Sequence, residues 1–387
     1  MSRSTADVLD HHAISAERGF LPEADPPARF DVDGHEPSVA EYLRAVDRLG
    51  AELPERIDEG TFRPAVEGLE TPPDGTFGVL TDREATRLCM LCGFFASAYV
   101  HELGADPVDR LPAGAAVPLY RTSRRFEREP ILSYDVLCLH NWKRRDPAAG
   151  FDPENLEAVQ RFTALDDERW FVVIHVAIEA RAGAALRACA RAQRAVREDE
   201  PDALVGSLGT VADSLEAQTA IMRRMTEGND PEAFANRYRP YYEGFDELVY
   251  EGVEAFEGTP RTYRGGSGAQ SSALPSIDAA LGIDHASTAL IEKLFDMRSY
   301  MPATHRTVID AFDAGPDVEP YVAASDRRDL REAYNRCVEE LAAFREVHFG
   351  QVIQYIREVT GDTTGTGGTD YVRFLREMTA ETEAQML

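Results

Sequence analysis

The chain has 387 residues, 43% of them hydrophobic and 9% aromatic, so it can bury a large core and its composition is not that of a disordered chain. Its net charge of -27 comes from 68 acidic and 41 basic residues, and every basic residue except Lys143 and Lys293 is arginine. Such a surface repels nucleic acid and anionic membranes, so we expect neither as a partner. The excess of carboxylates and the preference for arginine favour a salt-adapted protein from a halophilic source. The alternative is an acidic surface that docks a basic partner.

The five cysteines are odd in number and scattered, which predicts reduced thiols and a cytoplasmic protein. Cys89 and Cys92 form a CxxC, but no second ligand pair follows, so buried thiols on one helix face are favoured over a metal or redox site. We expect no signal peptide and no membrane span, because neither a leading apolar segment nor an 18-residue apolar run is present. A monomer is the favoured state, although the sequence does not determine it.

Apolar spacing predicts a mostly helical chain. The first 30 residues form an irregular lead-in, residues 60–80 a loop, residues 111–130 an extended connection, and residues 264–272 a glycine-rich interruption. Strand signals are scarce, so the predicted fold class is all-α. The expected helices span residues 37–58, 81–102, 153–197 with a break near Leu165, 203–227, 286–298, 303–313, 326–358 and 370–385.

Two histidines lie on the apolar faces of long predicted helices. His348 shares a stripe with Leu341 and Phe344, and His175 follows Phe171 by one turn. A histidine in such a place is commonly a hydrogen-bonded core residue. The alternative is that both line one cavity, one as an axial haem ligand and the other as a base on the distal side.

Three further segments are candidates for ligand contact. Arg239 lies among aromatic residues and could pair with a substrate carboxylate in a bidentate manner, although a salt bridge at a helix end is the plainer interpretation. The sequence RGGSGAQSS at 264–272 lacks the spacing of a phosphate loop and better suits close approach of backbone to a flat ligand. GTGGTD at 365–370 is either a linker or a loop that closes over a site.

These segments, taken in order, resemble the indoleamine 2,3-dioxygenase family. The resemblance covers the chain from Arg18 to its C-terminus. No single motif decides it, but many in register make chance a poor explanation. The matching stretches are RGFLP at 18–22, VPL at 117–119, PILSY at 130–134, NWKRRDP at 141–147, LVYEG at 248–252, GGSGAQSS at 265–272, LGI at 281–283, MRSYMPATHR at 297–306, REAYNRC at 331–337, FREVH at 344–348 and GTGGTD at 365–370.

The resemblance implies a small N-terminal helical domain over residues 1–128 and a large helical haem domain over residues 129–387, with a mobile loop at 361–370. It implies haem b, ferrous in the active state, with O2 as co-substrate, and conversion of L-tryptophan to N-formylkynurenine. It makes His348 the iron ligand. The other carried-over positions are Arg345, Asp278, Gly266, Ser267 and Gly268 around the cofactor, and Arg239, Phe171, Phe234, Tyr134, Thr366 and Ser267 around the substrate.

Some positions depart from the vertebrate pattern. His175 replaces a small hydroxyl residue, and we expect it to accept the indole N–H hydrogen bond, as a histidine does in the sister tryptophan dioxygenases. Ala235 replaces a phenylalanine, and Leu137 and Cys138 are expected to change the pocket floor. The altered pocket leaves two alternatives open: a haem enzyme acting on another indole derivative, and a non-catalytic haem sensor of O2 or redox state.

Overall fold

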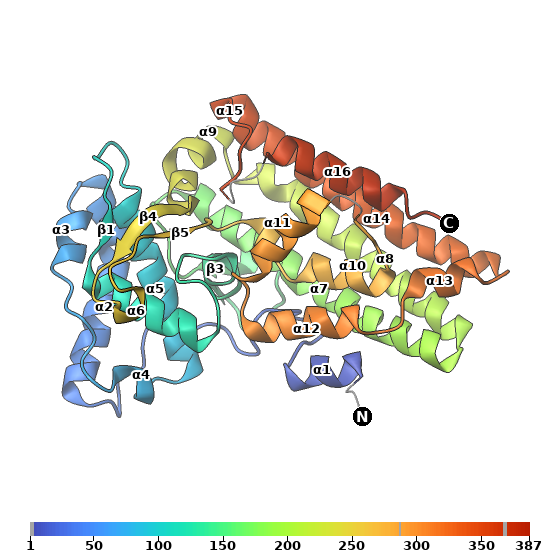
Figure 1. Ribbon diagram of the computed structural model, residues 1–387, viewed down its shortest axis with the longest axis horizontal. Helices are drawn as coiled ribbons and strands as arrows, with labels where there is room; N and C mark the ends of the chain where they lie inside the picture. Colours follow the sequence, from blue (N-terminus) through green and yellow to red (C-terminus); the bar gives the residue numbers. More distant parts are fainter. Residues whose placement is uncertain (1–3, 286–287, 367–369) are drawn as a thin grey trace.

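Long antiparallel helices form the centre of the molecule in the computed structural model, which describes residues 4–285, 288–366 and 370–387 (Figure 1). The long α7 lies along α8, α14 packs on α8, and α16 covers α14. Their bounds are α7 (Asp166–Glu198), α8 (Pro201–Arg223), α14 (Arg328–Val352) and α16 (Tyr371–Glu383).

Shorter helices close one side of this central group. α10 packs on α7 and α12, and α1 packs on both α7 and α12 although it lies at the start of the chain. The bounds are α1 (Thr5–His11), α10 (Ala273–Leu281), α11 (Thr288–Arg298), α12 (Ala303–Asp313), α13 (Val318–Ala323), α9 (Pro231–Ala233) and α15 (Glu358–Thr360).

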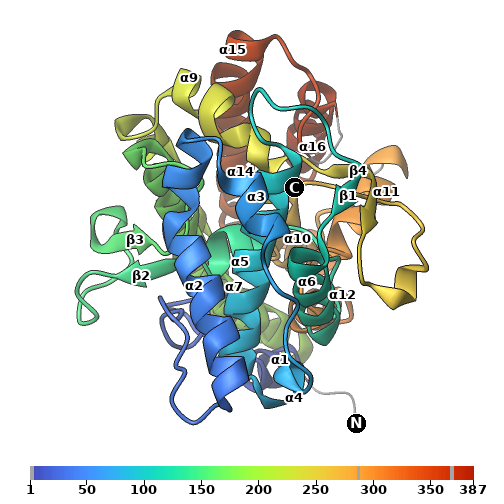
Figure 2. The ribbon, with the colours of Figure 1, turned by 90° about the vertical axis from the view of Figure 1, so that its left-hand side faces the viewer.

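The remaining helices gather at the other end of the molecule, where a small sheet lies beside them (Figure 2). They are α2 (Pro37–Asp58), α3 (Phe62–Glu67), α4 (Thr76–Val79), α5 (Asp82–Val100) and α6 (Ala113–Arg125). In the sheet, β1 (Arg110–Leu111) pairs in parallel with β4 (Phe245–Tyr250), and β4 pairs antiparallel with β5 (Arg261–Tyr263). Strands from the later part of the chain thus join the N-terminal end, and a domain boundary at residue 128 stays a prediction.

The connections contain short irregular elements. β2 (Trp142–Arg144) and β3 (Leu156–Ala158) form an antiparallel hairpin. Three π-helical turns occur at η1 (Asp135–Leu139), η4 (Phe234–Tyr238) and η8 (Ile353–Arg357), and such turns are common at functional sites. The 3-10 turns are η2 (Pro153–Asn155), η3 (Arg224–Glu227), η5 (Arg239–Tyr242), η6 (Glu254–Phe256) and η7 (Gly268–Gln270).

The predicted all-α class is confirmed, because the strands are few and short. The predicted start of the helix at 81–102 is also confirmed: the Thr81 hydroxyl accepts from the backbone N–H of Glu84, whose carboxylate accepts from the Thr81 backbone N–H. All five cysteines are free and buried. No helix within the described ranges has both the length and the apolar character of a membrane span.

Four predictions about local structure are wrong. The first 30 residues, expected to form an irregular lead-in, contain α1. Residues 111–130 contain α6, in which Pro112 occupies the N-cap and burial of Leu119 against the core offsets the interior Pro118. Gly114 permits this packing, since a Cβ there would lie 2.0 Å from the Leu69 carbonyl oxygen. Residues 153–165 form η2 and β3 rather than the first part of a helix, and residues 60–80 include α3 and α4.

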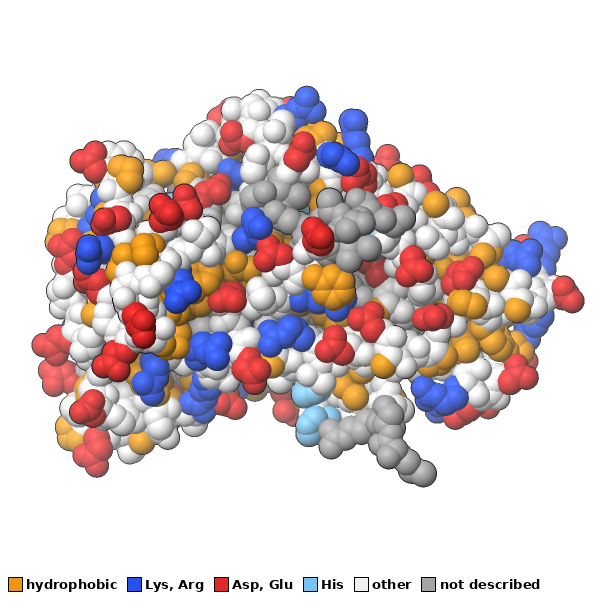
Figure 3. All heavy atoms as spheres, in the orientation of Figure 1, with side chains coloured by type: hydrophobic (Ala, Val, Ile, Leu, Met, Phe, Trp, Pro, Cys, Tyr) orange, Lys and Arg blue, Asp and Glu red, His pale blue; other side chains and the backbone are white. Residues whose placement is uncertain are grey.

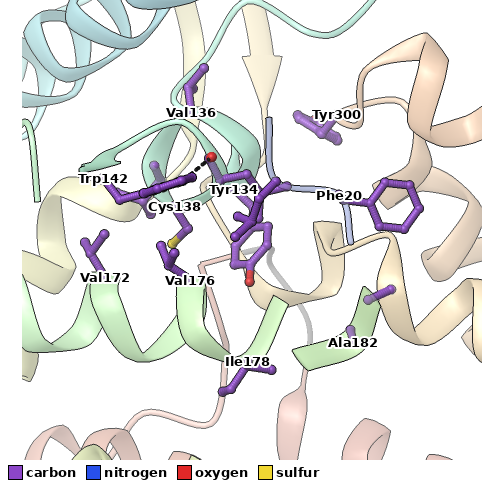
Figure 4. Close-up of a cluster of buried hydrophobic side chains, with 14 of the residues drawn as sticks. Phe20, Tyr134, Val136, Cys138, Trp142, Val172, Val176, Ile178, Ala182 and Tyr300 are labelled. Atoms are coloured by element: carbon purple, nitrogen blue, oxygen red, sulfur yellow. Dashed lines mark hydrogen bonds between the residues drawn. The ribbon is translucent and has the colours of Figure 1, made fainter. Parts of the chain in front are cut away.

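The core beside α7 is built from the segment that precedes the hairpin. Figure 4 shows Tyr134, Cys138 and Trp142 packed over Val172 and Val176 of α7. The Trp142 indole N–H donates to the Leu139 carbonyl at 2.8 Å, which satisfies its buried donor. This cluster fixes the outer side of α7, whose opposite side faces a cavity.

Candidate active site

A cavity of about 520 Å³ lies between α7, α10, α14 and α16. Its size is within the range of small-molecule and cofactor sites. The structure brings nearly all of the predicted site residues to its walls, although they are far apart in the sequence. Those that line it are Phe171, His175, Phe234, Arg239, Gly266, Ser267, Gly268, Asp278, Arg345, His348 and Thr366.

His175 presents a hydrogen-bond acceptor to the cavity. Its Nδ1 lies 2.8 Å from the backbone carbonyl oxygen of Phe171, one turn earlier on α7. Because a carbonyl oxygen only accepts, Nδ1 must carry the proton, and Nε2 then holds the lone pair. Burial lowers the pKa of His175 below its usual value, against the opposing effect of the Phe171 bond, so the ring is neutral.

Aromatic rings form one wall around His175. Phe171 lies 4.4 Å from the His175 ring centroid, 5.2 Å from that of Phe234 and 5.6 Å from that of Tyr242. Phe234 also meets Tyr355 of η8 edge-on at 5.7 Å. Tyr242 and Tyr355 line the cavity but were not among the predicted residues. These rings make an apolar wall suited to a flat aromatic ligand.

His348 enters the cavity from α14, on the far side from α7. Burial, together with the nearby His175, lowers its pKa to about 4, so its imidazole is neutral. No described residue forms a hydrogen bond with its ring. A neutral imidazole that projects a free nitrogen lone pair into an apolar cavity can serve as an axial metal ligand.

A buried ion pair lies one turn before His348. The Arg345 Nη2 donates to both carboxylate oxygens of Asp278, at 2.8 and 2.6 Å, and its Nη1 donates to the Thr382 hydroxyl. The pair therefore ties α14 to α10 and α16. The Arg345 Nε is buried without a hydrogen-bond partner. His285 adds an imidazole to the same carboxylate cluster, with its Nε2 3.7 Å from Asp278 Oδ2.

Arg239 is buried but only partly engaged. Its Nη1 lies 3.2 Å from the Glu243 carboxylate, and its Nη2 donates to the Thr364 carbonyl at 3.4 Å. Its Nε has no partner. Burial raises the pKa of Glu243, which weakens its hold on the guanidinium. Glu243 follows Arg239 by four residues and was not named from the sequence, although a salt bridge at a helix end was the plainer interpretation of Arg239.

The glycine-rich loop forms a further wall and is fixed by the loop near the C-terminus. The Thr366 hydroxyl donates to the Gly266 carbonyl at 2.8 Å, and the Gly265 N–H donates to the Thr366 carbonyl at 3.2 Å. A Cβ at Gly268 would meet no atom within 4 Å, so open space lies beside this backbone. Part of the predicted mobile loop, residues 367–369, lies outside the described residues.

Tyr134 does not line the cavity but supports its wall. Its ring lies edge-on to His175 at 5.9 Å, and its hydroxyl donates to Glu179 Oε1 at 3.0 Å. Ser271 donates to the same oxygen at 2.5 Å, and burial raises the pKa of Glu179. Sequence reasoning missed Glu179.

The expected change of the pocket floor is not found. Leu137 and Cys138 are buried, but neither lines the cavity. Ala235, the third departure from the vertebrate pattern, is also buried and away from the cavity wall. Leu137 and Cys138 belong to η1 and are part of the hydrophobic core, so their effect on a ligand is indirect.

The residues present fit a haem. Its iron would take His348, its ring would lie against the open backbone at Gly268 and the apolar cavity walls, and the unpartnered Arg345 Nε provides a buried donor nearby. Within the described residues no cluster of three or more His, Cys, Asp or Glu could hold a metal ion.

Comparisons with known proteins agree with this geometry. The family model described as indoleamine 2,3-dioxygenase matches residues 8–360. The chain is 34% identical to indoleamine 2,3-dioxygenase 1 of Rattus norvegicus, covering 98% of this chain and 96% of that protein. It is 28% identical to indoleamine 2,3-dioxygenase of Saccharomyces cerevisiae (97% and 93% covered), and 28% identical to 6-hydroxytryptophan 2,3-dioxygenase of Fusarium equiseti (95% of each).

The fold is all-α, and two histidines, His175 and His348, line its first cavity. The chain belongs to the indoleamine 2,3-dioxygenase family, whose model covers most of its length. It is therefore a haem-dependent dioxygenase that uses O2 as co-substrate. The roles of its individual site residues remain predictions.

Proposed function

We propose that this enzyme opens the indole ring of L-tryptophan and releases N-formylkynurenine. Both atoms of O2 enter the product: the C2–C3 bond breaks, and each carbon gains one carbonyl oxygen. The reaction consumes no external reductant. Haem, which we take to be haem b in the ferrous state, supplies activation of O2. The protein's own residues bind and orient the indole and exclude water.

The observation that carries this proposal is the acceptor nitrogen of His175. With Nδ1 committed to the Phe171 carbonyl, Nε2 is free to accept the indole N–H. Stacking of the indole on Phe171 and Phe234 would fix the plane of the ring, and the hydrogen bond would fix its rotation within that plane. Together they would hold C2 and C3 toward the reacting oxygen.

Arg239 supports an amino acid as substrate. Its unpartnered Nε and its weakly held Nη1 can pair with an α-carboxylate once Glu243 gives way. Ser267 and Thr366 border the same cavity and would contact the amino acid end. Tyr134 would support the indole pocket through its ring contact with His175. A sensor would not require a carboxylate clamp, so this arrangement favours catalysis.

A tryptophan derivative is the second candidate substrate. One relative with nearly full coverage is named a 6-hydroxytryptophan dioxygenase. Five free, buried thiols support a reducing compartment such as the cytoplasm. The acidic surface supports a salt-adapted protein.

Isotope labelling tests the proposal. The haem-loaded, reduced enzyme is mixed with L-tryptophan under 18O2, and the product is analysed by mass spectrometry. We expect N-formylkynurenine that carries two heavy oxygen atoms. A product with one labelled atom, or turnover of 6-hydroxytryptophan but not of tryptophan, would contradict it.

A further inference from the structure

A second cavity, of about 500 Å³, lies between the N-terminal segment, the first half of α5, the end of α6 and the start of α12. None of its lining residues lines the first cavity. Basic groups gather here although the chain carries a net charge of -27. Figure 3 shows basic side chains over α6 and the start of α12, near histidines at α1. The ionisable lining residues are His12, Glu23, Asp82, Arg83, Arg87, Arg125, Glu127, Arg128, His140 and His305.

Arg128 is the central residue of this cavity. Its side chain is 2% exposed, and its Nη1 pairs with the buried Asp135. Its Nε and Nη2 have no hydrogen-bond partner. These two nitrogens form the side-on edge of the guanidinium, which presents two parallel N–H bonds. Such an edge matches two oxygens of one carboxylate or phosphate.

The acidic lining residues do not occupy that edge. Asp82 pairs with Arg125 at 2.7 Å, and Glu127 lies 4.0 Å from Arg306. Glu23 is exposed. Arg83 forms no ion pair among the described residues and donates to a backbone carbonyl. Arg87 pairs with Asp47, so among the described lining arginines only Arg83 has no ion pair, and no carboxylate covers the Nε and Nη2 edge of Arg128.

Two imidazoles lie beside Arg128. Burial, and after it the charge of neighbouring groups that include Arg128, lowers the pKa of both His140 and His305 to about 3. The His305 ring is held between Phe20, at 4.6 Å, and the Ser272 hydroxyl, 3.3 Å from its Nδ1. Each neutral imidazole carries one N–H that can donate to an anion.

We propose that this second cavity binds a small oxyanion, two of whose oxygens accept from the Nε and Nη2 of Arg128. His140 and His305 supply the remaining contacts. The ligand class is a phosphate or a carboxylate rather than a halide, because a single halide ion cannot accept both N–H bonds along their own directions. The proposal does not depend on the substrate of the first cavity.

Anion-specific stabilisation tests the proposal. Thermal unfolding of the haem-loaded full chain is followed in sodium phosphate, sodium acetate and sodium chloride, at equal Na⁺ concentration and equal ionic strength. Screening of the acidic surface is then matched, and only anion binding differs. We expect a saturable rise of the midpoint in phosphate or acetate beyond that in chloride. Whichever of the two acts at lower concentration identifies the ligand as phosphate or carboxylate.

Variants locate the effect. Arg128→Gln should remove the saturable rise, whereas Arg110→Gln, on an exposed arginine, should keep it. Because Arg128→Gln leaves Asp135 buried without its partner, the double variant Arg128→Leu with Asp135→Leu provides a charge-neutral comparison, and it should also lose the rise. His305→Gln should raise the half-saturating concentration about tenfold, in line with loss of one hydrogen bond.

Two results would overturn the proposal. One is an equal response of the wild-type chain to all three anions. The other is a saturable phosphate or acetate response that survives both Arg128 substitutions; isothermal titration of phosphate into the same proteins checks this independently. A response lost in the Arg128 variants but unchanged in Arg110→Gln supports it.

Discussion

Replacement of His175 tests the proposed orientation of the indole. His175→Leu keeps much of the side-chain volume beside Phe171 but removes the acceptor nitrogen, whereas His175→Gln retains an acceptor oxygen. L-tryptophan offers the N–H that the acceptor would receive. 1-Methyl-L-tryptophan lacks that N–H and is the matched substrate.

The expected magnitude follows from a single neutral hydrogen bond. Such a bond contributes about 0.5–1.5 kcal/mol, which corresponds to a roughly 2- to 12-fold fall in kcat/KM for L-tryptophan in His175→Leu. For 1-methyl-L-tryptophan the same substitution should change kcat/KM less than about 2-fold. His175→Gln should recover part of the loss for tryptophan only.

The assay is steady-state formation of formylkynurenine, normalised to haem content from the absorption spectrum. Normalisation separates a loss of cofactor from a loss of rate. Equal losses for the two substrates would mean that His175 acts through packing. No loss for either would remove His175 from the site.

Three further predictions concern the remaining site residues. Arg239→Gln should raise KM for L-tryptophan more than tenfold but hardly change KM for tryptamine, which lacks the carboxylate. Glu243→Gln should lower KM for L-tryptophan, because it releases the Arg239 guanidinium. Equal effects on the two substrates in steady-state kinetics would contradict the carboxylate clamp. Asp278→Asn should lower the free energy of unfolding by about 3 kcal/mol, since it leaves Arg345 buried without its counter-ion; denaturant titration within 1 kcal/mol of wild type would refute it. Because burial lowers the pKa of His175, its neutral form persists through pH 6.5, so kcat/KM should stay flat from pH 8 to 6.5 and fall only below; a fall that begins above 6.5 would oppose it.

The periodicity of the chain predicted the long helices well. The start of α5 was predicted correctly, and the apolar stripes correctly placed His175 and His348 on long helices. Periodicity reports only which side of a helix is apolar. That two such sides face each other across one cavity depends on how α7, α8, α10 and α14 pack. The spacing left a shared cavity as one alternative, and the resemblance favoured it.

Other features could not be predicted because they depend on contacts between distant residues. α6 contains Pro118, which locally disfavours a helix, and only its packing against α5 explains it. β3 is three residues long and exists through its pairing with β2. Arg128 occurs in a run of charged residues typical of a surface, yet its side chain is buried against Asp135. Glu179 lies in an alanine-rich helix, and the sequence of that helix does not indicate that Glu179 accepts a hydrogen bond from the Tyr134 hydroxyl.

A spectrum combined with turnover tests the central claim most directly. The purified protein is reconstituted with haem and reduced without air, and its Soret band is recorded. L-tryptophan is then added with air, and the absorbance of N-formylkynurenine is followed. The His348→Ala variant is treated in the same way. We expect a haem spectrum and product from the wild-type chain, and loss of the haem spectrum, with no product, in the variant. Normal haem content and normal turnover in His348→Ala, or no haem in the wild-type chain, would contradict the assignment of the site.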